Sequence, residues 1–301
     1  MLTVRFWGVR GSLPTPGQDT VIYGGNTSCL EIRADDRLII IDLGSGIRPL
    51  GEWLLQNDKK KYGKIKADIF LTHTHWDHIM GFPMFNPIYI PGTELTITGP
   101  VSLENDDIKS IINNQMSHKY WPVRAGELAA AIKYTQIKEE NVDLGGGLTV
   151  TSKYLNHPIF CLGYRIGYQG KSITTVYDHE PFRNLFTAAH EAEGLDKEII
   201  MEGEVAAIEE NEKIRRFLKG SDIVIHDAQY TNEEFSNHLG WGHCSYDHAI
   251  QSAEGNDIKK IVLFHHEPSR TDSELDKVSK YYADKTSFEV IVAKEGLTLQ
   301  A

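Results

Sequence analysis

Short apolar runs bounded by Gly, Asp or Pro recur along the chain, from "RLIIIDLGSG" and "KADIFLTH" in the first quarter to "FEVIVA" near the C-terminus. Runs of this length with such boundaries are typical of buried β-strands. The pattern predicts strands over residues 37–46, 66–73, 94–100, 148–157, 161–168, 171–178, 222–227, 260–266 and 288–293.

A second pattern, apolar residues three to four positions apart with charges between them, predicts helices over residues 104–116 and 204–219. Two more helices are predicted over 245–253, after Ser245 as N-cap, and over 272–284, starting near Thr271. Strands dominate the first half and strands alternate with helices in the second, which indicates an α/β fold of sheets covered by helices. No linker or repeat interrupts the pattern, so we expect residues 1–301 to form one domain.

The charge of the chain bears on its partners. It has 301 residues, with 31 Lys and Arg against 42 Asp and Glu, which gives a net charge of −11. A negative protein repels a phosphate backbone at long range, so a long nucleic acid is disfavoured as a partner. The Lys59–Lys61 run, with Lys64 and Lys66, is predicted to be a solvated loop rather than a binding patch.

The cysteines and the lengths of the apolar runs indicate in which cellular compartment the protein is expected. Cys29, Cys161 and Cys244 are odd in number and far apart, which suggests neither a disulfide framework nor a Cys-type zinc site. The N-terminal stretch lacks the apolar core of a signal peptide, and no run approaches the roughly 18 residues of a membrane span. We expect a cytoplasmic protein without a membrane partner.

Histidines and carboxylates gather where the predicted strands end. One strand runs into "FLTHTHWDHIMGF", and four others end in His or Asp. A lone His at a strand end is usually a hydrogen-bonded core group, but five such ends together favour a metal site at one edge of the sheets. Neutral imidazole and carboxylate suit zinc, manganese or iron. The residues concerned are His73, His75, Asp77, His78, His157, Asp178, His226, Asp227, His265 and His266.

The spacing in "HTHWDH" suggests two ions. His73 and His75 alternate as in an extended segment, so both can face one cation, whereas Asp77 and His78 follow a turn and can face a second. Asp178 is the natural bridging carboxylate. Two cations about 3.5–4 Å apart would hold a hydroxide between them and clamp an in-line displacement at phosphorus.

The pattern H-x-H-x-D-H after a strand is similar to the signature of the metallo-β-lactamase superfamily, and "LNHP", "VYDHE" and "LFHHEPSR" follow in the same order. The resemblance implies a four-layer αββα sandwich. Within the superfamily, the chain resembles the phosphodiesterase branch that includes ribonuclease Z. "HDAQY" and "GHCS" stand where that branch has His-Glu-Ala and His-Ser-Thr, so Asp227 replaces Glu and Cys-Ser replaces Ser-Thr.

The resemblance implies a role for each site residue. His243 would stabilise the phosphorane oxygens or protonate the leaving oxygen, Asp227 would orient it, and Asp77 would complete the catalytic set. His265 rather than His266 would bind metal. His226, His179 and His238 are expected to make hydrogen bonds, and Cys244 to be a buried small residue. The implied ligands are His73, His75 and His157 for one metal, Asp77, His78 and His265 for the other, and Asp178 between them.

The His243–Asp227 pair favours a phosphodiester substrate. The Gly/Pro-rich arm with which ribonuclease Z grips tRNA is missing between Asp77 and His157, so a small phosphodiester such as a cyclic nucleotide is preferred. Tyr120 and Trp121 either stack on a base or pack against a helix. Residues 8–29 are interpreted as a hairpin near the site, with Asn26 a weak candidate for substrate contact.

Several alternatives stay open at this point. The chain could be a thioesterase or lactonase on the same fold, a tRNA 3′-processing endonuclease, or a redox di-iron module. Two divalent ions are expected; zinc is favoured by the His-rich ligand set, and manganese is the alternative. Dimers are common in the branch that the chain resembles, so a homodimer stays open.

Overall fold

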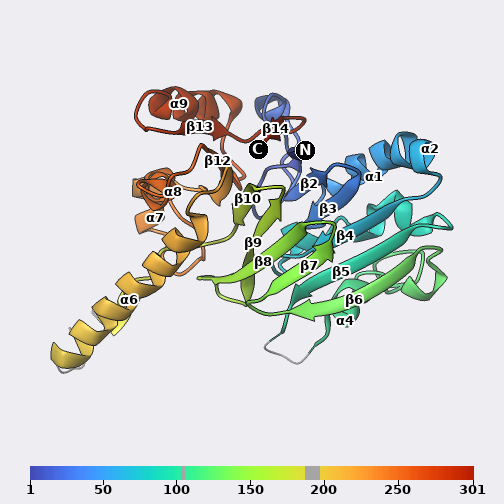
Figure 1. Cartoon of the computed structure of the whole chain (residues 1–301), viewed down its shortest axis with the longest axis horizontal. Helices are drawn as coiled ribbons and strands as arrows, with labels where there is room; N and C mark the ends of the chain where they lie inside the picture. Colours follow the sequence, from blue (N-terminus) through green and yellow to red (C-terminus); the bar gives the residue numbers. More distant parts are fainter. Residues whose placement is uncertain (103–105, 187–196) are drawn as a thin grey trace.

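A computed structural model describes residues 1–102, 106–186 and 197–301, and within them two seven-stranded sheets lie face to face (Figure 1). The first sheet has the order β14-β1-β2-β3-β4-β5-β6 and the second β13-β12-β11-β10-β9-β8-β7. The strands are β1 (Leu2–Gly8), β2 (Cys29–Ala34), β3 (Arg37–Ile41), β4 (Lys66–Phe70), β5 (Glu94–Pro100), β6 (Ala131–Ile137), β7 (Asn141–Gly145), β8 (Leu148–Leu155), β9 (Cys161–Tyr168), β10 (Lys171–Val176), β11 (Ile223–Asp227), β12 (Lys260–Phe264), β13 (Glu289–Val292) and β14 (Thr298–Gln300).

Both sheets follow the same plan. Strands β1 to β3 pair antiparallel, and β3 to β6 continue in parallel. In the second sheet β7 to β10 pair antiparallel and β10 to β13 in parallel. Parallel strands bring their carboxyl ends to one edge, where following loops can share a site. The ends of β4, β10, β11 and β12 therefore meet at the edge from which the polar loops leave.

Helices cover the outer face of each sheet (Figure 1). A core of buried side chains fills the space between the sheets, and two further clusters lie under the helices, which gives four layers. The predicted αββα sandwich is confirmed. The helices are α1 (Ile47–Gln56), α2 (Asp58–Tyr62), α3 (Trp76–Ile79), α4 (Ile108–Asn114), α6 (Lys197–Leu218), α7 (Asn232–Ser236), α8 (Tyr246–Ala253) and α9 (Asp272–Tyr282).

The core between the sheets fixes two site residues directly. The rings of Tyr177 and Phe264 stack 4.5 Å apart, and both side chains are fully buried. Tyr177 immediately precedes Asp178, and Phe264 immediately precedes His265. An aromatic pair in a close-packed core has few alternative positions. The stack therefore holds the ends of β10 and β12 at a constant separation.

Most predicted elements are present within a few residues. Strands β5 and β9 have the predicted bounds, and α8 begins after Ser245, whose side chain accepts a hydrogen bond from the His248 backbone N–H. Thr271 caps α9 in a capping box with Glu274. The helix predicted over 104–116 is α4, Ile108–Asn114; positions 104 and 105 lie outside the described residues.

Two predictions of local structure are wrong. The Lys59–Lys61 run forms helix α2 instead of a loop, and Gly63 in the left-handed conformation ends it. Residues 8–29 do not form a hairpin: Arg10 makes parallel bridges to Thr27 and His266, and a 3-10 turn occupies Gln18–Thr20. In both segments tertiary contacts, rather than a local apolar period, set the conformation.

None of the helices in the described ranges has the length and apolar character that crossing a bilayer requires.

Candidate metal centre

Four loops bring the predicted ligands together. The loop after β4 carries His73 and His75 and continues into α3, while the loops after β8, β10 and β12 each contribute one residue. All seven lie in two groups in which the nearest ligand atoms are within 4.8 Å of one another. The first group is His73, His75, His157 and Asp178, and the second is Asp77, His78, Asp178 and His265.

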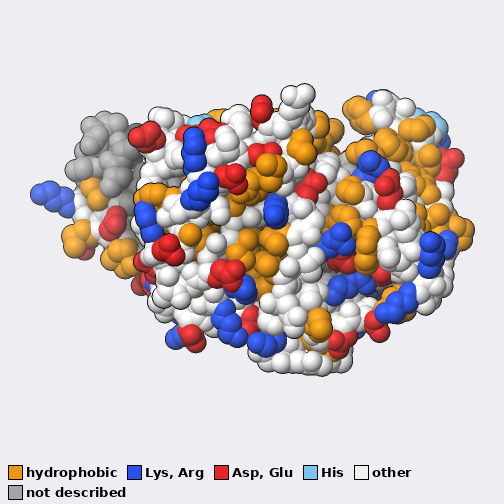
Figure 2. All heavy atoms as spheres, turned by 90° about the horizontal axis from the view of Figure 1, so that it is seen from above, with side chains coloured by type: hydrophobic (Ala, Val, Ile, Leu, Met, Phe, Trp, Pro, Cys, Tyr) orange, Lys and Arg blue, Asp and Glu red, His pale blue; other side chains and the backbone are white. Residues whose placement is uncertain are grey.

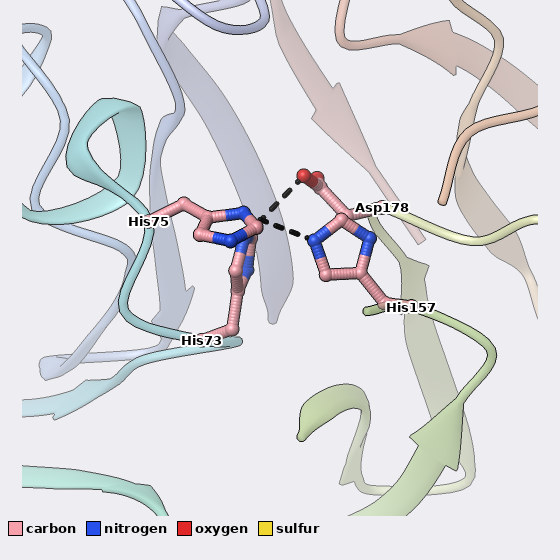
Figure 3. Close-up of side chains that lie close together, drawn as sticks. All are labelled: His73, His75, His157 and Asp178. Atoms are coloured by element: carbon pink, nitrogen blue, oxygen red, sulfur yellow. Dashed lines mark hydrogen bonds and ion pairs between the residues drawn. The ribbon is translucent and has the colours of Figure 1, made fainter. Parts of the chain in front are cut away.

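In the first group, three imidazoles and one carboxylate converge (Figure 3). Nε2 of His157 lies 3.0 Å from Nδ1 of His75, and Nε2 of His73 lies 3.5 Å from Oδ2 of Asp178. Burial lowers the pKa of His157 to about 4 and that of His73 well below its ordinary value. Both rings are therefore neutral near pH 7, which is the form that binds a metal.

In the second group, imidazole nitrogens and carboxylate oxygens lie close together. Nε2 of His78 and Nε2 of His265 are 3.2 Å apart, and Oδ2 of Asp77 lies 3.2 Å from each. Asp178 places Oδ2 3.3 Å from His78 and Oδ1 3.3 Å from His265. Because Asp178 belongs to both groups, its carboxylate stands between the two positions.

Neighbouring groups fix the tautomers of these rings. Nδ1 of His78 donates to Asp42 at 2.8 Å, Nδ1 of His265 to the Gln229 amide oxygen at 3.0 Å, and Nδ1 of His157 to the Gly242 carbonyl at 3.1 Å. A neutral imidazole that donates through Nδ1 has a bare lone pair on Nε2. The Nε2 atoms of these three rings are therefore directed into the two groups.

These residues fit a pair of divalent cations. Nε2 of His73 and Oδ1 of Asp178 are buried and have no hydrogen-bond partner among the described residues. Burial opposes a charge on His78, yet the carboxylates of Asp178, Asp77 and Asp42 raise its pKa well above its ordinary value. The electrostatic potential at this position therefore favours a bound cation. Imidazole nitrogens and carboxylate oxygens are the donors that zinc and manganese accept.

His243 lies beside the second group and is paired with Asp227. Its Nδ1 is 2.7 Å from Oδ2 of Asp227, and its ring stacks on that of His265 at 5.0 Å. Burial lowers the pKa of His243, but the Asp227 carboxylate outweighs burial and raises that pKa to about 9. His243 is therefore an imidazolium near pH 7, hydrogen-bonded to the Asp227 carboxylate.

The loop before His243 is held by a residue that sequence reasoning missed. The buried carboxylate of Glu180 accepts hydrogen bonds from the backbone N–H of Gly240 at 2.6 Å and of Gly242 at 3.1 Å. Because the Gly242 carbonyl accepts from His157, Glu180 links the His157 ring to the His243 loop. The only signal in the sequence is its position two residues after Asp178.

Asp42 and Ser12 were missed as well. Asp42 immediately follows β3 and accepts hydrogen bonds from the Thr72 N–H and from His78. The Ser12 N–H donates to Asp77 at 2.8 Å. The rule that found the other residues, a carboxylate after an apolar run, also applied to Asp42. Ser12 contributes only its backbone N–H, so its residue type gives no sign of this role.

The backbone is strained where the ligands sit. Asp178, His265 and Asp42 have φ of 37°, 62° and 65°, in a region that non-glycine residues rarely adopt. Such residues cost about 1–3 kcal/mol each and persist where the surrounding structure over-determines them. The buried hydrogen bonds and the stacked core supply that support here.

The remaining candidates have other partners. His266 points away, with Nε2 donating to the Ala293 carbonyl at 2.8 Å, so His265 is the ring that faces the site. His226 and His238 bond backbone carbonyls, His179 accepts from a backbone N–H, and Cys244 is buried, all as predicted. The Asn26 amide is bonded to Ser45 and Glu295, so it holds its loop and is not free for a substrate.

Comparison with known proteins gives a consistent picture. Residues 37–266 match the family model described as a beta-lactamase superfamily domain. A ribonuclease Z of Staphylococcus epidermidis is 31% identical over 169 residues, which cover 55% of this chain and 49% of the relative, so the chain spans about half the length of that relative. A ribonuclease Z of Clostridium tetani is 24% identical over 302 residues and 91% of each chain. The metallo-beta-lactamase fold protein YhfI from Bacillus subtilis superposes with a TM-score of 0.67 at 16% identity, covering 100% of this chain and 99% of the other.

Proposed function

The chain belongs to the beta-lactamase superfamily, and from this premise we propose that it is a metal-dependent phosphodiesterase acting on a small substrate such as a cyclic nucleotide. The observation that carries the proposal is the His243–Asp227 pair beside the group that contains His265. Hydrolysis of a phosphodiester requires a proton for the leaving alkoxide, and an imidazolium in contact with the centre supplies one.

The chain's own residues divide the work in this proposal. His73, His75 and His157 would hold one divalent cation, Asp77, His78 and His265 would hold the other, and Asp178 would contribute to both. When bound, the cations supply Lewis-acid chemistry: they activate water and neutralise charge on the phosphoryl oxygens. His243 donates its proton to the leaving oxygen, and Asp227 keeps its ring in place. Zinc is the preferred ion, with manganese second.

The net negative charge of the protein favours a small substrate over a long nucleic acid. The net charge is −11, and on the face seen in Figure 2 the Lys and Arg side chains are interspersed with Asp and Glu rather than gathered into a basic band. A long nucleic acid would need phosphate contacts from such a band. The second candidate function, tRNA 3′-end processing, is favoured by the relatives named ribonuclease Z.

One substrate panel tests the proposal. The zinc- and manganese-loaded protein is assayed on bis-p-nitrophenyl phosphate, cyclic mono- and dinucleotides, a precursor tRNA with a 3′ trailer, a thioester and a lactone. Turnover of a cyclic nucleotide above that of the precursor tRNA is the expected result. Cleavage of the precursor alone would select the second candidate, and activity on only the thioester or lactone would discard the phosphodiester proposal.

A further inference from the structure

We propose that an aromatic cavity beside the metal centre binds the nucleobase of the substrate, an inference that rests on the proposed phosphodiesterase function. The cavity has a volume of about 490 Å³. Its wall includes Thr74 and Trp76, which alternate in the chain with the site residues His75 and Asp77. The cavity therefore borders the segment that carries two of the candidate metal ligands.

Two aromatic side chains of this cavity are unusually exposed. Trp76 has 71% of its surface accessible and Tyr120 has 74%. Large aromatic rings bury 150–250 Å² when they are covered, so leaving them in water forgoes stabilisation. Trp76 stands between two candidate metal ligands, and its exposed ring adds nothing to the stability of the fold. Its exposed face is, however, a platform on which any base can stack.

One side of the cavity is held in place. Trp121 donates from Nε1 to the Tyr89 hydroxyl at 2.9 Å, and Tyr89 donates to the Pro83 carbonyl at 2.6 Å. Trp121 also packs against the core under the first sheet. Trp121 therefore gives the cavity one fixed aromatic side. The sequence left open whether Tyr120 and Trp121 stack on a base or pack against a helix; in the structure Trp121 packs on the core and lines the cavity, while Trp76 and Tyr120 supply the exposed rings.

The polarity of the wall distinguishes a base from a phosphate. No residue in the described part of the wall carries a charge, so a phosphate has no partner in the cavity. The amides of Asn114 and Gln115 also line it, and Nε2 of Gln115 has no hydrogen-bond partner in the described ranges. Amide groups pair with the donor and acceptor edge of a base. A plain acyl chain would leave the buried Nε2 of Gln115 without a partner.

Two esters with the same leaving group test the proposal through activity. Thymidine 5′-(p-nitrophenyl phosphate) carries a base, and methyl p-nitrophenyl phosphate does not. Base stacking contributes about 1–3 kcal/mol, equivalent to about 5- to 150-fold. Trp76→Ala and Tyr120→Ala are each expected to raise KM for the thymidine ester by that factor, and to leave KM for the methyl ester unchanged. Trp76→Phe keeps a ring and is expected to recover part of the loss.

A binding measurement separates this inference from the hydrolytic proposal. Calorimetry on the metal-loaded protein is expected to give a Kd for thymidine 5′-monophosphate that rises about 5- to 150-fold in both alanine variants, while Kd for inorganic phosphate stays constant. Tyr281→Ala, an exposed ring on α9 outside the cavity, is the matched control and is expected to change neither Kd. Metal content is measured on every sample, and Tyr120→Ala is decisive if Trp76→Ala loses metal.

The outcomes are distinct. If the wild type hydrolyses neither ester but the binding pattern holds, the phosphodiesterase proposal fails and the base site stands. If both esters are cleaved but the alanine variants affect them equally or not at all, and binding of the monophosphate is unchanged, the base site is overturned. A rise in KM for a thioester alone in the variants would mean that an acyl group occupies the cavity, which also overturns it.

Discussion

Nε2 of His78 and Nε2 of His265 face each other at 3.2 Å in the buried interior of the site. Each ring donates its Nδ1 proton to a different partner, Asp42 for His78 and Gln229 for His265. Oxygens of Asp77 and Asp178 lie within 3.3 Å of both nitrogens, and their negative charge raises the pKa of His78 well above its ordinary value. This arrangement of nitrogens and carboxylates is expected in a protein whose centre binds a divalent cation.

His243 is predicted to act on turnover and not on metal binding. His243→Ala is expected to lower kcat on bis-p-nitrophenyl phosphate by about 10²- to 10⁴-fold, because general acid catalysis contributes about that much. Metal content measured on the same sample is expected to match that of the wild type. Loss of both metals in the variant would mean that His243 is a ligand, and the assignment of its role would be wrong.

Asp42 is predicted to set metal affinity through His78. Asp42→Asn keeps the shape and tolerates the φ of 65°, because Asn adopts the left-handed conformation more readily than most residues. It weakens the acceptor for Nδ1 of His78, so zinc affinity is expected to fall about 10- to 100-fold in a chelator competition assay. Asp222→Asn, a carboxylate that accepts from the Ser172 N–H, is the control. Equal zinc affinity in the two variants would contradict the prediction.

Two glycines of one loop form a matched pair. A Cβ on Gly242 would lie 2.1 Å from Nδ1 of His157, whereas a Cβ on Gly240 would come no closer than 3.7 Å, to Arg183. Both have similar φ, 84° and 87°, so alanine costs each about 1–2 kcal/mol of backbone strain. Only Gly242→Ala is expected to displace the His157 ring and lower activity, by about 10- to 100-fold. Similar activity in the two variants, checked at equal stability, would show that the contact is unimportant.

His248 is predicted to make stability depend on pH. Burial lowers its pKa to about 4 from an ordinary value near 6.5, with a further contribution from the nearby His226 and Arg215. The unfolded chain therefore binds more protons between pH 6.5 and 4, and stability falls as the pH drops through that window. His248→Gln is expected to reduce the slope there by up to about 1.4 kcal/mol per pH unit. Urea unfolding of both metal-free proteins at several pH values measures it; an unchanged slope would contradict it.

The sequence predicted the fold class and the residues that the structure clusters. Apolar runs ending in His or Asp marked β4, β8, β10, β11 and β12, because the same buried strands that form the core deliver the polar residues to one edge. The spacing in "HTHWDH" divided the first loop correctly between the two groups. The resemblance to a known superfamily added the pairing of His243 with Asp227, which spacing alone did not give.

Other features depend on contacts that the sequence does not record. Glu180 bonds N–H groups some sixty positions later in the chain, and Gln229 orients a ring 36 positions away. The strands β1, β2, β6, β7 and β14 were not predicted, and neither were the helices α1, α2 and α7. Helix α2 is five residues long, too short for an apolar period to identify it. The parts that could not be predicted are those fixed by tertiary neighbours.

The central claim is that seven side chains hold two divalent cations, and metal analysis tests it most directly. The protein is loaded with zinc, dialysed, and measured by mass spectrometry, and a crystal of the same sample is examined by anomalous scattering. We predict two ions per chain, one in each group of ligands with Asp178 at both, and loss of this pair in Asp178→Asn. An ion count below two, or anomalous peaks away from His73 and His265, would contradict the claim.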